Sequence, residues 1–99
     1  MKDIIGSLNK EFENRIRLGI MSTLVVQDWV EFNALKTLLE LTDGNLASHI
    51  AALEKAGFIE VKKEFVGKKP RTTYRVTKSG RKAFEEHLNA LEKLLNLRG

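Results

Sequence analysis

One stretch of the chain decides its fold, and it reads TDGNLASHIAALEKAG over residues 42–57. Leu46, Ile50 and Leu53 recur at helical spacing and form a single apolar stripe. The first residue of the stretch, a threonine, is a good N-cap, and its last, a glycine, suits a left-handed C′ position. We therefore predict a helix that runs to about Ala56. Its opposite face is small or polar and carries Gly44, Asn45, Ser48, Ala51, Ala52 and Lys55.

Three further helices are predicted upstream of this one. The first covers Asp3–Phe12 and is short and amphipathic. The second covers Asn14–Val26, where Gly19 suggests close packing against a neighbour, because glycine inside a helix costs about 1 kcal/mol relative to alanine. The third covers Ala34–Leu39 and is capped by the preceding asparagine. Its inward-facing residues are Leu35, Leu38 and Leu39. Residues 28–32 are too short for a helix and are predicted to be extended.

Downstream, the pattern changes from helical to extended. Phe58–Val66 and Arg71–Val76 are β-branched and aromatic, and Gly67–Pro70 between them has the composition of a turn. These segments predict a two-stranded hairpin. A last helix covers residues 77–97 and is apolar along one face, with Phe84, Leu88, Leu91 and Leu95.

The basic charge of the chain is concentrated on the hairpin and the start of the last helix. The formal net charge is +4. Residues 62–82 carry nine basic and one acidic side chain, a net charge of +8, so the rest of the chain carries −4. Lysines on an edge strand also prevent aggregation. Nine cations exceed what that protection requires, and the excess favours contact with nucleic acid.

Composition excludes several classes of function. The 99 residues amount to one domain, residues 1–99, and they contain no cysteine, so a disulfide framework, a thiolate zinc site and a cysteine nucleophile are excluded. His49 and His87 lack carboxylates at ligand spacing, so neither a metal nor a cofactor is expected, and His87 fits packing or a dimer contact. No serine has a partnered histidine and no phosphate-binding loop precedes a helix, so the chain is not expected to be an enzyme. The absence of long apolar runs and of a leader favours a cytoplasmic protein without membrane contact.

The order of elements is that of a winged helix-turn-helix, mainly α with a β-hairpin (α+β), with extra N- and C-terminal helices. The helix-turn-helix covers residues 33–56 and the wing covers 58–76. The sequences FNALK (32–36), LTDGNLASHI (41–50), LEKAGFI (53–59) and GKKPRTTY (67–74) together resemble a family of small bacterial and archaeal winged-helix transcriptional regulators related to the MarR and ArsR groups.

The resemblance covers roughly Asn14 to Leu91 and implies a homodimeric DNA-binding regulator. It implies a recognition helix at Thr42–Lys55 and a wing at Val61–Val76. Two departures matter: MarR proteins are usually longer, which puts a ligand pocket between dimer and DNA-binding parts in doubt, and the cysteines of ArsR metal sensors are absent before the turn. Neither an effector nor metal sensing is therefore implied for this chain.

The predicted function is sequence-specific binding of double-stranded DNA, with helix 42–56 in the major groove and wing 61–76 on the backbone or minor groove. A homodimer would read a pseudo-palindromic operator. The predicted DNA-binding residues are Thr42, Gly44, Asn45, Ser48, His49, Lys55, Lys62, Lys68, Lys69, Arg71 and Thr73. His49 fits a packing role equally well.

The two end helices, 1–12 and 77–97, are predicted to form the dimer interface. The residues predicted to meet the partner are Ile4, Ile5, Leu8, Phe12, Phe84, Leu88, Leu91 and Leu95. The same leucine stripe could instead belong to the core of one chain. An alternative function is a protein–protein interaction module whose basic wing docks on an acidic partner.

Overall fold

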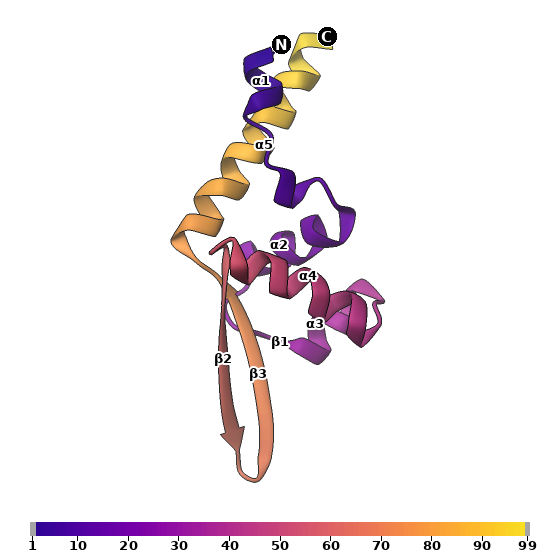
Figure 1. Ribbon diagram of the computed structural model, residues 1–99, viewed down its shortest axis with the longest axis vertical. Helices are drawn as coiled ribbons and strands as arrows, with labels where there is room; N and C mark the ends of the chain where they lie inside the picture. Colours follow the sequence, from indigo (N-terminus) through magenta and orange to yellow (C-terminus); the bar gives the residue numbers. More distant parts are fainter. Residues whose placement is uncertain (1, 99) are drawn as a thin grey trace.

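A computed structural model of the chain describes residues 2–98, and the side chains of residues 2–96. Its elements are, in chain order, α1 (Lys2–Gly6), the 3-10 helix η1 (Lys10–Phe12), α2 (Arg15–Val26), β1 (Val30–Glu31), α3 (Phe32–Leu39), α4 (Asp43–Lys55), β2 (Ile59–Val66), β3 (Lys69–Val76) and α5 (Lys78–Arg98). The molecule is elongated, about 55 Å by 25 Å by 21 Å. Figure 1 shows α2, α3 and α4 in the middle, the β2–β3 hairpin projecting at one end, and α1 beside α5 at the other. This is the winged-helix arrangement that the order of elements predicts.

Local capping signals set the ends of α2 and α4. The Asn14 side chain accepts hydrogen bonds from the backbone N–H groups of Ile16 and Arg17, at 2.8 and 3.3 Å. The Thr42 hydroxyl accepts one from Asn45 N–H at 3.2 Å. Past the end of α4, Gly57 has a φ of +81°, the left-handed conformation that favours glycine. The predicted bounds of both helices are confirmed to within one residue.

The predicted cap of α3 is wrong. This helix begins at Phe32, directly after β1, so Asn33 lies inside its first turn. Glu31 takes the cap position without a side-chain hydrogen bond, because it is also the last residue of the strand. Leu38, predicted to face inward, is largely exposed, whereas Leu35 is fully buried. A short helix packed on one side can bury only the residues of that side.

The predicted single helix over Asp3–Phe12 is also wrong, because the segment breaks at its middle. Asn9 starts a separate 3-10 turn, and its side chain accepts a hydrogen bond from Glu11 N–H at 2.9 Å. The Asn9 backbone N–H donates to Nδ1 of His87 on α5, also at 2.9 Å. A contact with a distant helix therefore replaces the helical hydrogen bond that would have continued α1.

The sheet has three antiparallel strands in the order β1-β3-β2. Residues 28–32, predicted to be an extended connection, contain β1, where Val30 pairs with Tyr74. In the hairpin, Val66 pairs with Lys69, so the turn has only two central residues. Of these two, Gly67 alone has a positive φ, +67°, which is the pattern of a type II′ turn.

The core lies where α2, α4, α5 and the sheet meet. The Phe12 ring packs against those of Phe58, Phe84 and His87, with centroids 5.2, 5.4 and 5.5 Å away. Gly19 approaches α3 so closely that a Cβ there would lie 3.0 Å from a methyl carbon of Leu39, which confirms the predicted packing. Within residues 2–98, none of the helices has both the length and the apolar character that a bilayer crossing requires.

Candidate nucleic-acid interface

The outward face of α4 is smooth and polar. Leu46, Ile50 and Leu53 are buried on its inner side, as the spacing predicts. The outer side leaves Gly44 and Ser48 exposed, and a Cβ built on Gly44 meets no atom within 4 Å. The exposed residues on this face or at the ends of α4 are Thr42, Asp43, Gly44, Asn45, Ser48, Ala51, Lys55 and Ala56. A helix with this face fits a major groove about 12 Å wide without obstruction.

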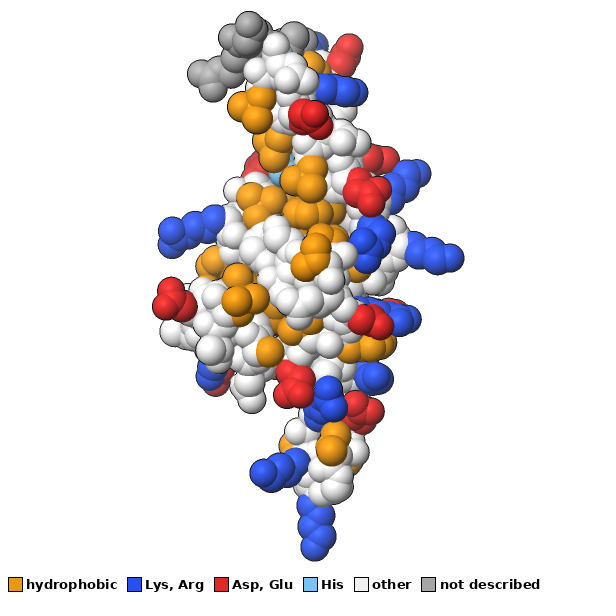
Figure 2. Space-filling view, turned by 180° about the vertical axis from the view of Figure 1, so that it is seen from behind, with side chains coloured by type: hydrophobic (Ala, Val, Ile, Leu, Met, Phe, Trp, Pro, Cys, Tyr) orange, Lys and Arg blue, Asp and Glu red, His pale blue; other side chains and the backbone are white. Residues whose placement is uncertain are grey.

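The wing presents its lysines without internal partners. All residues of the hairpin from Val61 to Arg71 are exposed. Among the side chains that the structure describes, Lys63, Lys68 and Lys69 form no ion pair within 4 Å. Figure 2 shows basic side chains at the tip of the projecting hairpin. These three cations can neutralise an anion with no ion pair to break first.

The base of the wing is built differently, around Trp29. Nζ of Lys62 lies 4.5 Å from the centroid of the indole ring, and the Arg75 guanidinium lies 4.6 Å from it. Arg75 also forms an ion pair with Glu60. Lys62, predicted to bind DNA, is thus held by a cation–π contact at the base of the hairpin. This role of Trp29 could not be predicted from the sequence, because Trp29 precedes Lys62 by 33 residues and only the fold brings them together.

Two other residues of the wing that were predicted to bind DNA are not freely available to it. Thr73 is 1% exposed, so it cannot touch DNA and its prediction is wrong. It sits on the middle strand, where it pairs with Lys62 of β2 on one side and with Glu31 of β1 on the other. Arg71 is exposed, but its Nε lies 3.2 Å from a carboxylate oxygen of Glu31. Arg71 must leave or share that surface ion pair to bind a phosphate.

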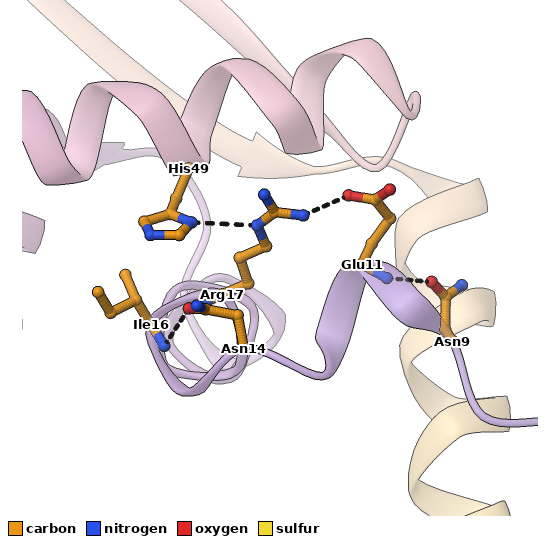
Figure 3. A network of polar contacts seen from close by, with 6 residues as sticks. All are labelled: Asn9, Glu11, Asn14, Ile16, Arg17 and His49. Atoms are coloured by element: carbon orange, nitrogen blue, oxygen red, sulfur yellow. Dashed lines mark hydrogen bonds and ion pairs between the residues drawn. The ribbon is translucent and has the colours of Figure 1, made fainter.

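A polar network ties α4 to the N-terminal part of the chain (Figure 3). Nη1 of Arg17 on α2 lies 2.6 Å from Oε2 of Glu11, and its Nε donates to Nδ1 of His49 at 3.1 Å. His49 therefore turns its ring toward α2, away from the outer face of α4, which favours the packing role over DNA contact. Burial, together with the positive charge of Arg17, lowers the pKa of His49. No local pattern in the sequence singles out Arg17, because His49 lies 32 residues away on another helix.

The start of α4 carries a second link. Nζ of Lys36 on α3 lies 2.8 Å from a carboxylate oxygen of Asp43. Asp43 is in the first turn of α4, where the helix dipole stabilises negative charge. The pair holds the two helices of the helix-turn-helix at their junction. The Asp43 carboxylate lies beside the exposed face of α4, and its negative charge offsets part of the positive charge of Lys36.

The α1–α5 end of the molecule exposes apolar side chains. Leu88, Leu91 and Leu95 of α5 are 44%, 37% and 65% exposed, and Ile5 of α1 is 55% exposed. Figure 2 shows hydrophobic side chains gathered along this upper end. A groove of about 490 Å³ lies between the two helices, with Ile4 and Leu8 among its lining residues.

Two residues predicted for the dimer interface belong to the core instead. Phe12 is fully buried and Phe84 is 3% exposed, and their rings contact each other. Neither can meet a second chain, so these two predictions are wrong. Phe84 lies on the same helical face as the three leucines, but it belongs to the first turns of α5, which pack on the body of the same chain, whereas the leucines further along the helix are exposed.

His87 is buried and accepts its hydrogen bond from Asn9 only as a neutral ring. Burial lowers its pKa below the ordinary 6.5, and nearby Glu13 offsets this in part. The unfolded state therefore binds a proton at His87 more readily than the folded state does. His87 contributes fully to stability above about pH 6.5, and this contribution is lost as the pH falls through the folded-state pKa.

We expect the free energy of unfolding, measured by urea denaturation, to decrease as the pH falls below about 6.5. In a His87→Asn variant the amide oxygen takes the place of Nδ1 and can still accept the Asn9 N–H, but the side chain does not titrate. The decrease should therefore be smaller in this variant. Equal slopes in the two proteins would show that His87 is not the group responsible.

The chain is similar to known proteins over most of its length. Residues 16–95 match a family model described as a winged helix DNA-binding domain. An uncharacterized protein of Methanocaldococcus jannaschii is 39% identical over 79 residues, which cover 80% of this chain and 86% of that protein. The structure of a transcriptional regulator homologue from Pyrococcus horikoshii superimposes with a TM-score of 0.84 at 32% identity, covering 96% of this chain and 92% of that one.

Two further structures share the fold at low identity. The YusO protein of Bacillus subtilis has a TM-score of 0.81 at 14% identity, covering 98% of this chain and 68% of that one. MarR has a TM-score of 0.75 at 20% identity, covering 88% of this chain and 63% of that one. The resemblance to small winged-helix proteins that the sequence motifs indicate is confirmed by the family model, and MarR shares the fold.

Proposed function

Since the chain belongs to the winged helix DNA-binding domain family, we propose that it is a transcriptional regulator, similar in fold to MarR, that binds double-stranded DNA sequence-specifically as a homodimer. The family is one of DNA-binding regulators and not of enzymes. We further propose that residues 1–99 act as one domain, with the helix-turn-helix and wing on DNA and the end helices on the partner.

The observation that carries the proposal is the pairing of a smooth polar helix face with an unpaired basic hairpin. Helix α4 enters the major groove, where Asn45 and Ser48 can hydrogen-bond to base edges. The wing lies along the adjacent backbone, where Lys68 and Lys69 neutralise phosphates. Base contacts then give specificity, and phosphate contacts give affinity that depends on salt.

The dimer is supported by the shape of α5. This helix has 21 residues, which corresponds to about 30 Å. Leu88, Leu91 and Leu95 are exposed, although they continue the helical face on which Phe84 is buried near the start of α5. A two-fold arrangement of α5 and α1 would cover them and present two copies of α4 to one face of a duplex.

Binding to DNA is tested by fluorescence anisotropy with a labelled random-sequence duplex at low and high salt. We expect binding at low salt and a steep loss of affinity as salt rises. The alternative, docking on an acidic protein, is tested by competition with polyglutamate of matched charge. Competition as strong as that of unlabelled duplex would favour the alternative and contradict the proposal.

The dimer is tested by a Leu88→Glu/Leu95→Glu variant. Because both side chains are exposed, the fold should tolerate them, whereas like charges facing each other across a two-fold seam should separate the protomers. Light scattering should give twice the 11.2 kDa chain mass for the wild type and the chain mass for the variant. Val26→Glu, at an exposed position on α2, is the control and should remain dimeric. A monomeric wild type would contradict the proposal.

A further inference from the structure

The tip of the wing carries an apolar cluster that the chain itself does not cover. Phe65 is 74% exposed and Val66 is 55% exposed. The cross-strand partner of Phe65 is Pro70, which is also exposed. Phe65 is thus a large aromatic side chain on an edge strand, a position where exposed apolar groups promote aggregation.

The register explains why no part of the core reaches Phe65. Side chains alternate along β2, so Phe65 lies on the same face as Ile59, which is buried. Six residues separate the two, which at about 3.3 Å per residue puts Phe65 roughly 20 Å further out along the strand. The hairpin projects from the helices over this length (Figure 1). The apolar face of the wing therefore continues past the body that buries its base.

The charges around Phe65 indicate what covers it. Lys63 lies on the same face, Lys68 lies in the turn and Lys69 begins β3, and none of the three has an ion pair among the described residues. The unpaired lysines can bind the anionic groups of a polymer, and the aromatic ring can contact flat apolar groups that lie between those anions. DNA is such a polymer, because its phosphates flank stacked bases.

We propose that Phe65 is an apolar wedge, which the wing inserts against a base step in the minor groove while the adjacent lysines bind the flanking phosphates. The proposal rests on the proposed DNA-binding function and extends it to the mode of contact. The minor groove is about 6 Å wide, so only the tip of the hairpin enters it. Insertion unstacks the step and kinks the duplex, and it favours the easily deformed pyrimidine–purine steps. Phe65 then determines specificity through the deformability of DNA.

The test uses a mixed-sequence duplex in which 2-aminopurine replaces adenine at its TA steps. Because 2-aminopurine fluoresces more strongly when it is unstacked, the wild-type protein should raise the fluorescence on binding. A Phe65→Ser variant should lose this rise and bind roughly 100-fold more weakly, the effect of losing one aromatic–base contact in each protomer of the dimer. Its salt dependence should be unchanged, because the lysines remain.

Two control variants, together with the affinity of the wild type for the duplex, separate the wedge from DNA binding itself. Phe65→Leu keeps an apolar wedge and should retain much of the fluorescence rise. Val26→Ser removes a side chain that is equally exposed but lies on α2, and it should behave as the wild type. Wild-type binding without a fluorescence rise, or an equal rise with Phe65→Ser, would overturn the wedge and leave DNA binding intact. Failure of the wild type to bind the duplex at all would instead contradict the proposed function.

Discussion

Replacing Lys68 and Lys69 together with alanine is expected to flatten the salt dependence of DNA binding. If each lysine neutralises one phosphate, a dimer loses four contacts and the log–log slope decreases by about 3.6. Between about 50 and 200 mM salt, the wild type should then lose roughly 100-fold more affinity than the variant. The effect is large because neither lysine has an ion partner among the described residues, so both charges are available to DNA.

The control for this prediction removes the same charge elsewhere. Lys10 in η1 and Lys82 on α5 are exposed and lie outside the hairpin and α4. A Lys10→Ala/Lys82→Ala variant has the same net charge as the wing variant, and its slope should stay close to that of the wild type. Anisotropy titrations across a salt series give both slopes. Equal flattening in the two variants would mean that only overall charge matters and that the wing makes no specific contact.

Replacing Gly80 with alanine is expected to destabilise the chain severely. A Cβ at this position would lie 2.0 Å from the carbonyl oxygen of Phe58, and 2.7 and 2.8 Å from its C and Cα atoms. All three are backbone atoms, so no rotamer change can relieve the clash. The same junction carries the hydrogen bonds from Thr77 N–H to Phe58 O at 3.0 Å and from Gly80 N–H to the Thr77 hydroxyl at 2.9 Å. We expect a loss of about 3 kcal/mol or more, at the upper end for overpacking.

Thermal denaturation measures this loss. For a domain of this size, about 3 kcal/mol corresponds to a decrease in Tm of at least about 12 °C. The matched control is Gly44→Ala on α4, where an added Cβ meets no atom within 4 Å and should leave stability unchanged or raise it by up to about 1 kcal/mol. A Gly80→Ala variant as stable as the wild type would show that α5 does not pack this closely on the end of α4.

The sequence predicted well those features that local signals determine. The bounds of α4 depend on Thr42 and Gly57, a cap at each end, and its buried face follows from the spacing of three apolar residues. The hairpin was predicted from the change from a helical to an extended pattern of side chains and from the glycine in the turn. These are properties of neighbouring residues, so they are readable without the rest of the fold, and they sufficed to predict the main elements of the proposed interface.

The errors arose where distant residues decide the outcome. The break in the N-terminal helix depends on the contact of Asn9 with His87, 78 residues away. Thr73 was predicted to bind DNA as part of a two-stranded wing, but β1 joins the sheet beside it, and Thr73 is buried in the middle strand. His49 lies at the edge of the buried face of α4, and only the position of Arg17 on another helix turns its ring inward.

Selection of bound sequences from a random duplex pool tests the central claim most directly, since it measures sequence reading by a dimer. We predict that the selected sequences share two inverted half-sites whose centres lie about 10–10.5 bp apart, or a multiple of that spacing. An Asn45→Ala variant should change the bases preferred within each half-site, whereas the Lys68→Ala/Lys69→Ala variant should select the same motif with lower affinity. Enrichment of no motif, under salt conditions where the wild type still binds the pool, would contradict the account.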